Sequence, residues 1–140
     1  MSRIFWDTNL FIYLIEDYGK FSDRVVALRQ RMLERGDQLF TSSLTLGEVL
    51  VKPFEVGDED LAEQYRQAIT AGATIIDFDS DAAAIYARIR KDRSLRPPDA
   101  IQLACAAATE VELFITNDDR LSQKTVWGIH FVMSLERALI

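Results

Sequence analysis

Four acidic residues, far apart in the chain, have the type and position needed for a cation site. They are Asp7, Glu48, Asp99 and Asp118. Asp7 and Asp118 follow predicted strands, Asp99 lies in the first turn of a predicted helix, and Glu48 lies about two turns into the helix after the second strand. Two carboxylates about 4 Å apart repel by roughly 4 kcal/mol at an effective dielectric constant of about 20. A whole domain has a net stability of only about 5 to 15 kcal/mol. Acids that converge in this way therefore need a cation or shared protons.

The ligand atoms of such a site would all be oxygen, which favours a hard cation, Mg²⁺ or Mn²⁺. Zinc is disfavoured because the chain has one His and one Cys, neither near the carboxyl end of a predicted strand. A hard cation among carboxylates suits phosphodiester hydrolysis, since it activates water and stabilises the leaving oxygen. Thr8, Asn9 and Thr116 are short polar residues that we expect to hold the carboxylates in orientation.

Each acid also has an ordinary structural explanation. Asp7 and Asp118 could cap the helices that follow them, and Asp99 could be a first-turn acid favoured by the helix dipole. Thr45 and Glu48 have the spacing of a capping box, unless Ser42 or Ser43 caps the helix and Glu48 lies inside it. For any single acid these explanations are as good as a ligand role. Together, four acids at strand ends favour one site.

Strand patterns alternate with helix patterns along the chain. Because parallel strands need crossover connections, this alternation predicts an α/β fold, a three-layer α/β/α sandwich with a parallel sheet. Ligands of such sheets bind beyond the carboxyl ends of the strands, where the strand order reverses. The acids converge if the first and fourth strands are neighbours there. The five predicted strands are residues 4–6, 38–41, 74–78, 113–116 and 130–133.

Several helix boundaries follow from capping residues and prolines. Ser22 is predicted to cap a helix that ends at Gly36, with Phe21 and Val26 as a hydrophobic staple. Pro53 is predicted to end the helix that begins after the second strand. The other predicted helices are residues 9–16, 58–72, 80–89 and 99–109, with short helices at 119–123 and 134–139.

The 140 residues, 49% hydrophobic and 27% charged, predict a single domain spanning residues 1–140. Cys105 cannot form an internal disulfide and lies in an apolar run, where we expect a buried, inert thiol. No apolar run reaches membrane-spanning length and no signal peptide precedes the first strand. These features predict a soluble protein of the reducing cytoplasm, without a membrane partner.

The net charge of −6 argues against broad, non-specific binding to nucleic acid. One local run opposes this trend, directly before Asp99. A solvated helix face is its default interpretation, and a track for an RNA backbone is the alternative. The run consists of Arg88, Arg90, Lys91, Arg93 and Arg96.

The motifs, taken in order, resemble those of a PIN domain. They are Asp7-Thr8-Asn9, Ser42 through Glu48, Pro98-Asp99-Ala100 before an alanine-rich run, and Ile115-Thr116-Asn117-Asp118. The resemblance spans the whole chain, which in size and order is similar to the stand-alone VapC-type toxins of toxin–antitoxin pairs. It implies a five-stranded parallel sheet, an endoribonuclease dependent on Mg²⁺ or Mn²⁺, a homodimer, and an antitoxin that blocks the site.

Carried over by residue, the resemblance implies that the family's acidic positions fall on Asp7, Glu48, Asp99 and Asp118, and that Thr116 is the hydroxyl residue before the last acid. Asp119 has no assigned role. An inert PIN-like module that binds RNA or protein is the alternative, although all four acids are present. A phosphoacceptor receiver domain is disfavoured, because it needs an acidic pair after the first strand and a Lys after the fifth.

Overall fold

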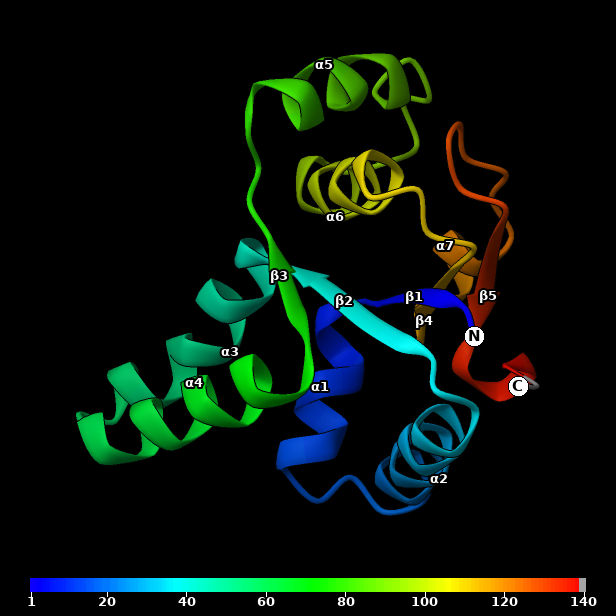
Figure 1. The fold of residues 1–140 in the computed structure, drawn as a ribbon. Helices are drawn as coiled ribbons and strands as arrows, with labels where there is room; N and C mark the ends of the chain where they lie inside the picture. The colour runs from blue at the N-terminus through cyan, green and yellow to red at the C-terminus, as the bar shows by residue number, and fades with distance from the viewer. Residues whose placement is uncertain (139–140) are drawn as a thin grey trace.

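Five parallel strands form the central sheet of the computed structural model, which describes residues 1–138 (Figure 1). The spatial order is β3-β2-β1-β4-β5, so β1 lies at the centre and the order reverses between β1 and β4. A receiver domain has the order 2-1-3-4-5, which excludes that alternative. The strands are β1 (Arg3–Trp6), β2 (Gln38–Ser42), β3 (Thr74–Ile76), β4 (Leu113–Thr116) and β5 (Phe131–Ser134).

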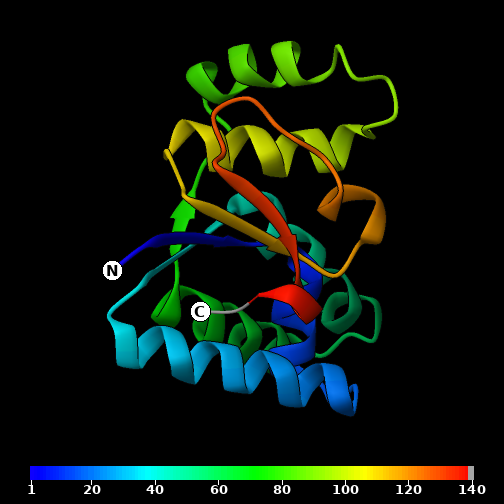
Figure 2. The same ribbon diagram turned by 90° about the vertical axis from the view of Figure 1, so that its right-hand side faces the viewer.

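Helices cover both faces of this sheet, which confirms the three-layer α/β/α prediction (Figures 1 and 2). One face carries α5 (Ser80–Ile89) and α6 (Pro97–Ala108). The opposite face carries α1 (Thr8–Ile15), α2 (Lys20–Arg35), α3 (Ser43–Glu55) and α4 (Glu59–Gly72). The short α7 (Asp119–Ser122) follows β4, and a 3-10 turn, η1 (Leu135–Arg137), follows β5. None of the helices in residues 1–138 is long and apolar enough to cross a membrane.

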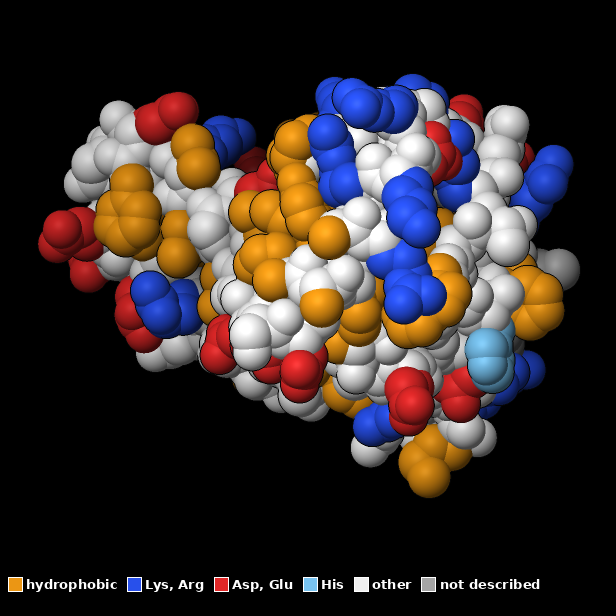
Figure 3. Space-filling model, turned by 90° about the horizontal axis from the view of Figure 1, so that it is seen from above, with side chains coloured by type: hydrophobic (Ala, Val, Ile, Leu, Met, Phe, Trp, Pro, Cys, Tyr) orange, Lys and Arg blue, Asp and Glu red, His pale blue; other side chains and the backbone are white. Residues whose placement is uncertain are grey.

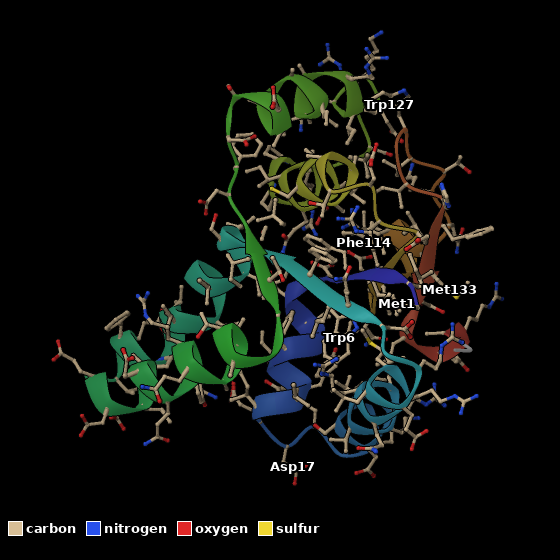
Figure 4. All side chains as sticks on the ribbon, in the orientation of Figure 1. Met1, Trp6, Asp17, Phe114, Trp127 and Met133 are labelled. Carbon is tan, nitrogen blue, oxygen red and sulfur yellow. The ribbon has the colours of Figure 1, made fainter. Side chains whose placement is uncertain are left out.

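The core lies in two layers because successive strand side chains point to opposite faces. On β1, Phe5 faces α5 and α6, whereas Ile4 and Trp6 face the other helices. The rings of Phe5 and Phe114 stack across neighbouring strands with centroids 5.1 Å apart, and Trp6 lies on the other side of the sheet (Figure 4). Burying side chains of this size contributes about 1.5 to 3 kcal/mol each. This apolar centre fixes the strand ends.

The start of α2 differs from the prediction. The helix begins at Lys20 rather than after Ser22, and the Ser22 hydroxyl accepts a hydrogen bond from the Tyr18 amide at 2.8 Å. Val26 is 54% exposed, so the predicted hydrophobic staple is wrong. The predicted stop is confirmed, because Gly36 adopts the left-handed conformation with φ of 73°.

Two helix boundaries beside prolines differ from the prediction. Pro53 lies inside α3, which continues to Glu55, because its carbonyl and that of Lys52 still accept hydrogen bonds from later amides. Helix α6 begins at Pro97 rather than at the predicted residue 99, because a first-turn residue needs no N–H partner and proline fits there. Strand β3 ends at residue 76 and β5 begins at residue 131. Residue 139, the predicted end of the last helix, lies outside the described residues.

Candidate active site

All four predicted acids line one pocket at the carboxyl ends of the strands. Asp7 follows β1 and Asp118 follows β4, and these strands are neighbours, so the Asp7 amide donates to the Ile115 carbonyl at 3.0 Å. Glu48 comes from α3 and Asp99 from the first turn of α6. The pocket has a volume of about 230 Å³, and its lining is completed by Thr8, Asn9, Ile12, Arg96, Pro98 and Gln102.

Asp7 lies deepest among the acids. Its two carboxylate oxygens accept hydrogen bonds from the Thr8 amide at 2.9 Å and the Thr116 hydroxyl at 2.8 Å. Burial raises the pKa of Asp7 to about 6, against the lowering effect of these two hydrogen bonds, and the nearby charges of Asp99 and Glu48 raise it further. A cation beside Asp7 would favour its charged form and offset this penalty.

Glu48 is held by a hydroxyl rather than by a capping box. It lies inside α3, which begins at Ser43, so the capping-box explanation is wrong. The Thr8 hydroxyl donates to Glu48 Oε1 at 2.6 Å, which ties the acid of α3 to the residue after Asp7. The capping explanations of Asp7 and Asp118 hold, since each also caps the helix that follows it. A cap and a pocket acid are therefore compatible roles.

Two arginines lie against Asp99 and Asp118, which are both partly buried. Arg120 contacts Asp118 Oδ2 at 2.8 Å and Asp99 Oδ2 at 3.4 Å. Arg96 Nε lies 3.3 Å from the same Asp99 oxygen. Burial alone would raise the pKa of Asp118, but the hydrogen bonds and charge of Arg120, with the charge of Arg96, lower it. Asp118 therefore stays ionised over a wide pH range.

Gln102 is a pocket residue that the sequence analysis missed. It is 2% exposed, and its amide nitrogen donates to the hydroxyls of Thr8 at 2.9 Å and Thr45 at 2.8 Å. Its carbonyl oxygen accepts from the Ser42 hydroxyl. A sequence signal was present, because Gln102 follows Asp99 by one helical turn and is the one amide in an otherwise apolar run.

The remaining predicted residues lie in different places. Thr8 and Thr116 contact acids as expected, whereas the side-chain oxygen of Asn9 lies 3.4 Å from the Asn117 amide at the pocket. Asp119 is the first residue of α7 and faces a separate hollow beside β5. Burial raises the pKa of the Cys105 thiol to about 11, which keeps it protonated and unreactive.

Four residues of the predicted basic run lie outside the pocket, and only Arg96 lines it. The predicted helix face is wrong for most of the run. Helix α5 ends at Ile89 and α6 begins at Pro97, so the residues from Arg90 to Arg96 form the connection between these helices.

The donor set fits a hard divalent cation in kind, since every acid offers carboxylate oxygens and hydroxyls hold two of them. Within residues 1–138, however, no three His, Cys, Asp or Glu side chains are gathered closely enough to hold one ion as they stand. Asp99 and Asp118 face arginines instead. Ligation by all four acids therefore requires these arginines to turn away.

The fold and the pocket define a class of α/β domain with clustered acids at the point where strand order reverses. A sequence profile of the PIN domain matches residues 4–126, and the chain therefore belongs to the PIN-domain family. No curated protein sequence matches the chain.

Solved structures agree with this assignment at the level of the fold. VapBC2 from Rickettsia felis, bound to a DNA fragment from its promoter, shares 14% identity with a TM-score of 0.71, over 94% of this chain and 98% of that one. DNA-bound VapBC from Salmonella typhimurium shares 19% identity with a TM-score of 0.72, over 96% of this chain and 99% of that one. A toxin–antitoxin complex from Klebsiella pneumoniae shares 24% identity with a TM-score of 0.66, over 90% of this chain and 94% of that one.

Proposed function

We propose that this protein is a metal-dependent endoribonuclease that hydrolyses RNA phosphodiester bonds with Mg²⁺ or Mn²⁺. The proposed metal ligands are Asp7, Glu48, Asp99 and Asp118. The observation that carries this proposal is the pocket in which all four acids meet, with the pKa of Asp7 raised to about 6 by burial and by two neighbouring carboxylates. Burial disfavours the charged form of the Asp7 carboxylate, and a bound cation would offset that penalty.

The chain's own residues hold the acids in place for this chemistry. Thr116 and the Thr8 amide fix the two oxygens of Asp7, and the Thr8 hydroxyl fixes Glu48. When bound, a divalent ion of this kind lowers the pKa of water and stabilises charge on the scissile phosphate. Arg96 and Arg120 supply positive charge at the pocket mouth, where a phosphate has to enter.

We further propose that the protein is the toxin of a VapBC-type pair, with a cognate antitoxin as its protein partner and with a homodimer as its assembly. This proposal is supported by membership of the PIN-domain family and by the likeness of the fold to the three complexes described above. An inert PIN-like binding module is the alternative, and it is less well supported because every proposed ligand is present.

Cleavage of RNA tests the enzymatic proposal. Purified away from any antitoxin, the protein should cut structured RNA with Mg²⁺ or Mn²⁺ and stop when a chelator is added. Asp7→Asn and Asp99→Asn should remove most of the activity. Cleavage without metal, or full activity in both variants, would contradict the proposal, and no cleavage under any condition would favour the inert module.

Expression in bacteria tests the toxin proposal separately. We expect growth to arrest when the protein is produced alone, and the product of a small adjacent gene to relieve the arrest. Asp7→Asn is the matched control, because it should be produced without arrest. Normal growth during production of active nuclease would contradict the toxin role and leave the nuclease role standing.

A further inference from the structure

A band of basic side chains crosses the face of the molecule formed by α5 and the connection to α6 (Figure 3). From Arg88 to Arg96 the chain carries five basic residues and one acid, against a net charge of −6 overall. Among the described residues, Lys91 and Arg93 make no ion pair or side-chain hydrogen bond, and Arg88 contacts only an aromatic ring. These three side chains are therefore available to an anionic partner.

Trp127 lies exposed at one end of this band, beside the C-terminal end of α5 (Figure 4). Its side chain is 53% exposed, and the Arg88 guanidinium lies 4.6 Å from the ring centroid. Single exposed apolar side chains are common on protein surfaces, so the feature that sets Trp127 apart is the cationic side chain over its ring. A tryptophan beside an arginine offers a flat surface and positive charge together.

The turn that carries Trp127 is fixed to the rest of the fold. Val126 and Ile129 on either side are both 7% exposed, and the Ile129 amide donates to the Val126 carbonyl at 3.2 Å. Gly128 has φ of 83°, and a Cβ there would lie 2.9 Å from the Ala107 side chain. Only glycine fits this close approach without strain. The exposed ring is thus held on a rigid turn.

The basic band and the Trp127 turn are also joined to each other. Lys124, at the start of the same loop, donates to Asp92 at 3.1 Å and to the Ser94 hydroxyl at 2.6 Å. Arg90 donates to the Leu95 carbonyl at 2.9 Å and shapes the connection from within. A preformed surface of this kind loses little conformational entropy when a ligand binds.

The band leads from Trp127 to the acid pocket. At its far end Arg96 lines the pocket and lies against Asp99, so the basic residues of the connection lead from the stacking surface to the acid pocket, with Asp92 as the one acid among them. We propose that this surface binds a single-stranded segment of the RNA substrate, with its phosphates along Arg88, Lys91 and Arg93 and one base stacked on Trp127. The proposal rests on the nuclease function above and names its substrate class.

Single-stranded RNA fits this surface better than duplex RNA or a protein. An aromatic ring can stack only on a base that is not already stacked and paired inside a helix. The charged side chain that lies over the Trp127 ring is the Arg88 guanidinium, which favours an anionic partner over an apolar protein surface. Trp127 also lines a separate hollow with Ile85, Ala107 and Glu112, so the argument applies to the side of the ring that carries Arg88. Rows of cations with an interspersed aromatic ring are typical of sites that bind single strands.

Binding measured in chelator tests the proposal without any cutting. A short fluorescent oligoribonucleotide of mixed sequence should bind the wild type, and Trp127→Ala should weaken its binding by about 5- to 150-fold, the loss of one stacked base. Trp127→Phe should recover much of the affinity. Phe131→Ala is the matched control, because Phe131 is also exposed (65%) but lies on β5, away from the band. It should bind like the wild type.

Charge and stacking are separated by a second probe. Lys91→Gln with Arg93→Gln should reduce the slope of log affinity against log salt by about 1.4, two phosphate contacts at about 0.7 each. Inorganic polyphosphate has charge but no bases. It should lose affinity in the double variant and bind Trp127→Ala like the wild type. Melting temperatures like that of the wild type check that each variant is folded.

Two results would overturn the inference. One is equal affinity of the wild type, Trp127→Ala and the double variant for the oligoribonucleotide. The other is an equal Trp127→Ala effect on a fully paired duplex, or an effect confined to an antitoxin protein. Neither touches the nuclease proposal, which is tested separately by cleavage with and without metal and by the Asp7→Asn and Asp99→Asn variants. Conversely, a protein that binds as described but never cuts would keep this surface and lose the nuclease.

Discussion

The acid pocket has two unlike halves. Asp7 and Glu48 are held by neutral hydroxyl and amide groups, and the pKa of Asp7 is raised to about 6 by burial. Asp99 and Asp118 lie at the other side, where two arginines contact them and the pKa of Asp118 is lowered despite partial burial. One half is held by buried neutral side chains, although Glu48 itself is exposed, and the other is balanced by the charges of two arginines.

This difference indicates a division of labour within the proposed metal site. If the side chain of Thr8 or Gln102 moved away, buried polar groups would lose their hydrogen bonds. The inner half therefore keeps its geometry with or without a cation. Arg120 is 51% exposed and can swing into solvent at small cost, because exposed ion pairs contribute little. Under the proposed function, the inner half would position the ion, and the outer half would release the Arg120 contact when the ion binds.

The largest expected effect comes from breaking the inner half. Asp7→Asn should reduce RNA cleavage by roughly 10³-fold, since a lost ligand removes several kcal/mol of transition-state stabilisation. Asp77→Asn is the matched control, because Asp77 also follows a strand but lies exposed beyond the edge strand β3. Initial rates at saturating Mn²⁺ measure both. Equal rates for the two variants would mean that the inner half does not take part in catalysis.

Stability against pH tests the raised pKa of Asp7 itself. The folded pKa is about 6 and the unfolded value 3.8, so the folded state holds this proton to a higher pH than the unfolded chain. Stability contributed by the group is complete below about pH 4 and is lost as pH rises through about 6. As pH rises from about 4 to above 6, the wild type should lose about 3 kcal/mol of stability relative to Asp7→Asn. This figure is about 1.36 kcal/mol for each unit by which the folded and unfolded pKa values of Asp7 differ.

Urea unfolding in chelator, repeated from pH 4 to pH 7, measures this shift. Asp77→Asn serves again as the control and should follow the wild type at every pH. Parallel stability profiles for Asp7→Asn and the wild type would show that burial does not perturb the inner acid.

Removing the amide that supports the inner half should have a smaller effect. Gln102→Ala removes one of the hydrogen-bond partners of the Thr8 and Thr45 hydroxyls and leaves the Ser42 hydroxyl without its side-chain partner, which costs about 1 to 3 kcal/mol of stability. Cleavage should also fall by about 10- to 100-fold, because Thr8 then holds Glu48 less firmly. Gln67→Ala, on the exposed side of α4, should change neither quantity. If Gln102→Ala lost stability but cleaved RNA at an unchanged rate, Gln102 would have a structural role and no role in positioning Glu48.

The outer half should respond least and in the opposite direction. Arg120→Gln removes a cation that competes for Asp118 and Asp99, so Mn²⁺ affinity should rise by about 2- to 5-fold, up to about 1 kcal/mol. Arg66→Gln, which breaks an exposed pair on α4, should leave the affinity unchanged. Isothermal titration gives both constants. A weaker affinity in Arg120→Gln would mean that the arginine supports ion binding instead.

Sequence predicted the four acids and their meeting place because the rule for parallel sheets ties them to strand ends. Asp7 and Asp118 were inferable once β1 and β4 were taken as neighbours, and Glu48 and Asp99 followed from their positions in helices. The metal role of these acids stays a prediction. Neither the periodicity nor the spacing of the chain could supply that role.

The rest of the pocket depended on packing that no local pattern encodes. Arg120 reaches Asp99 only because α7 folds back beside the first turn of α6, and Gln102 reaches Ser42 only because α6 lies over β2. The misplaced start of α2 has a local cause, since Ser22 bonds backward to Tyr18 and Glu16 instead of capping forward. Pro53 was misjudged because helices tolerate a lost amide when flanking carbonyls keep their partners.

Binding of Mn²⁺ is the most direct test of the acid pocket as a metal centre. Electron paramagnetic resonance of free Mn²⁺, titrated with protein in the absence of RNA, should show strong binding by the wild type and by Asp77→Asn. Binding by Asp7→Asn should be weaker by at least about 10-fold, the lower bound for a lost metal contact. Equal Mn²⁺ affinity in all three proteins would contradict the account.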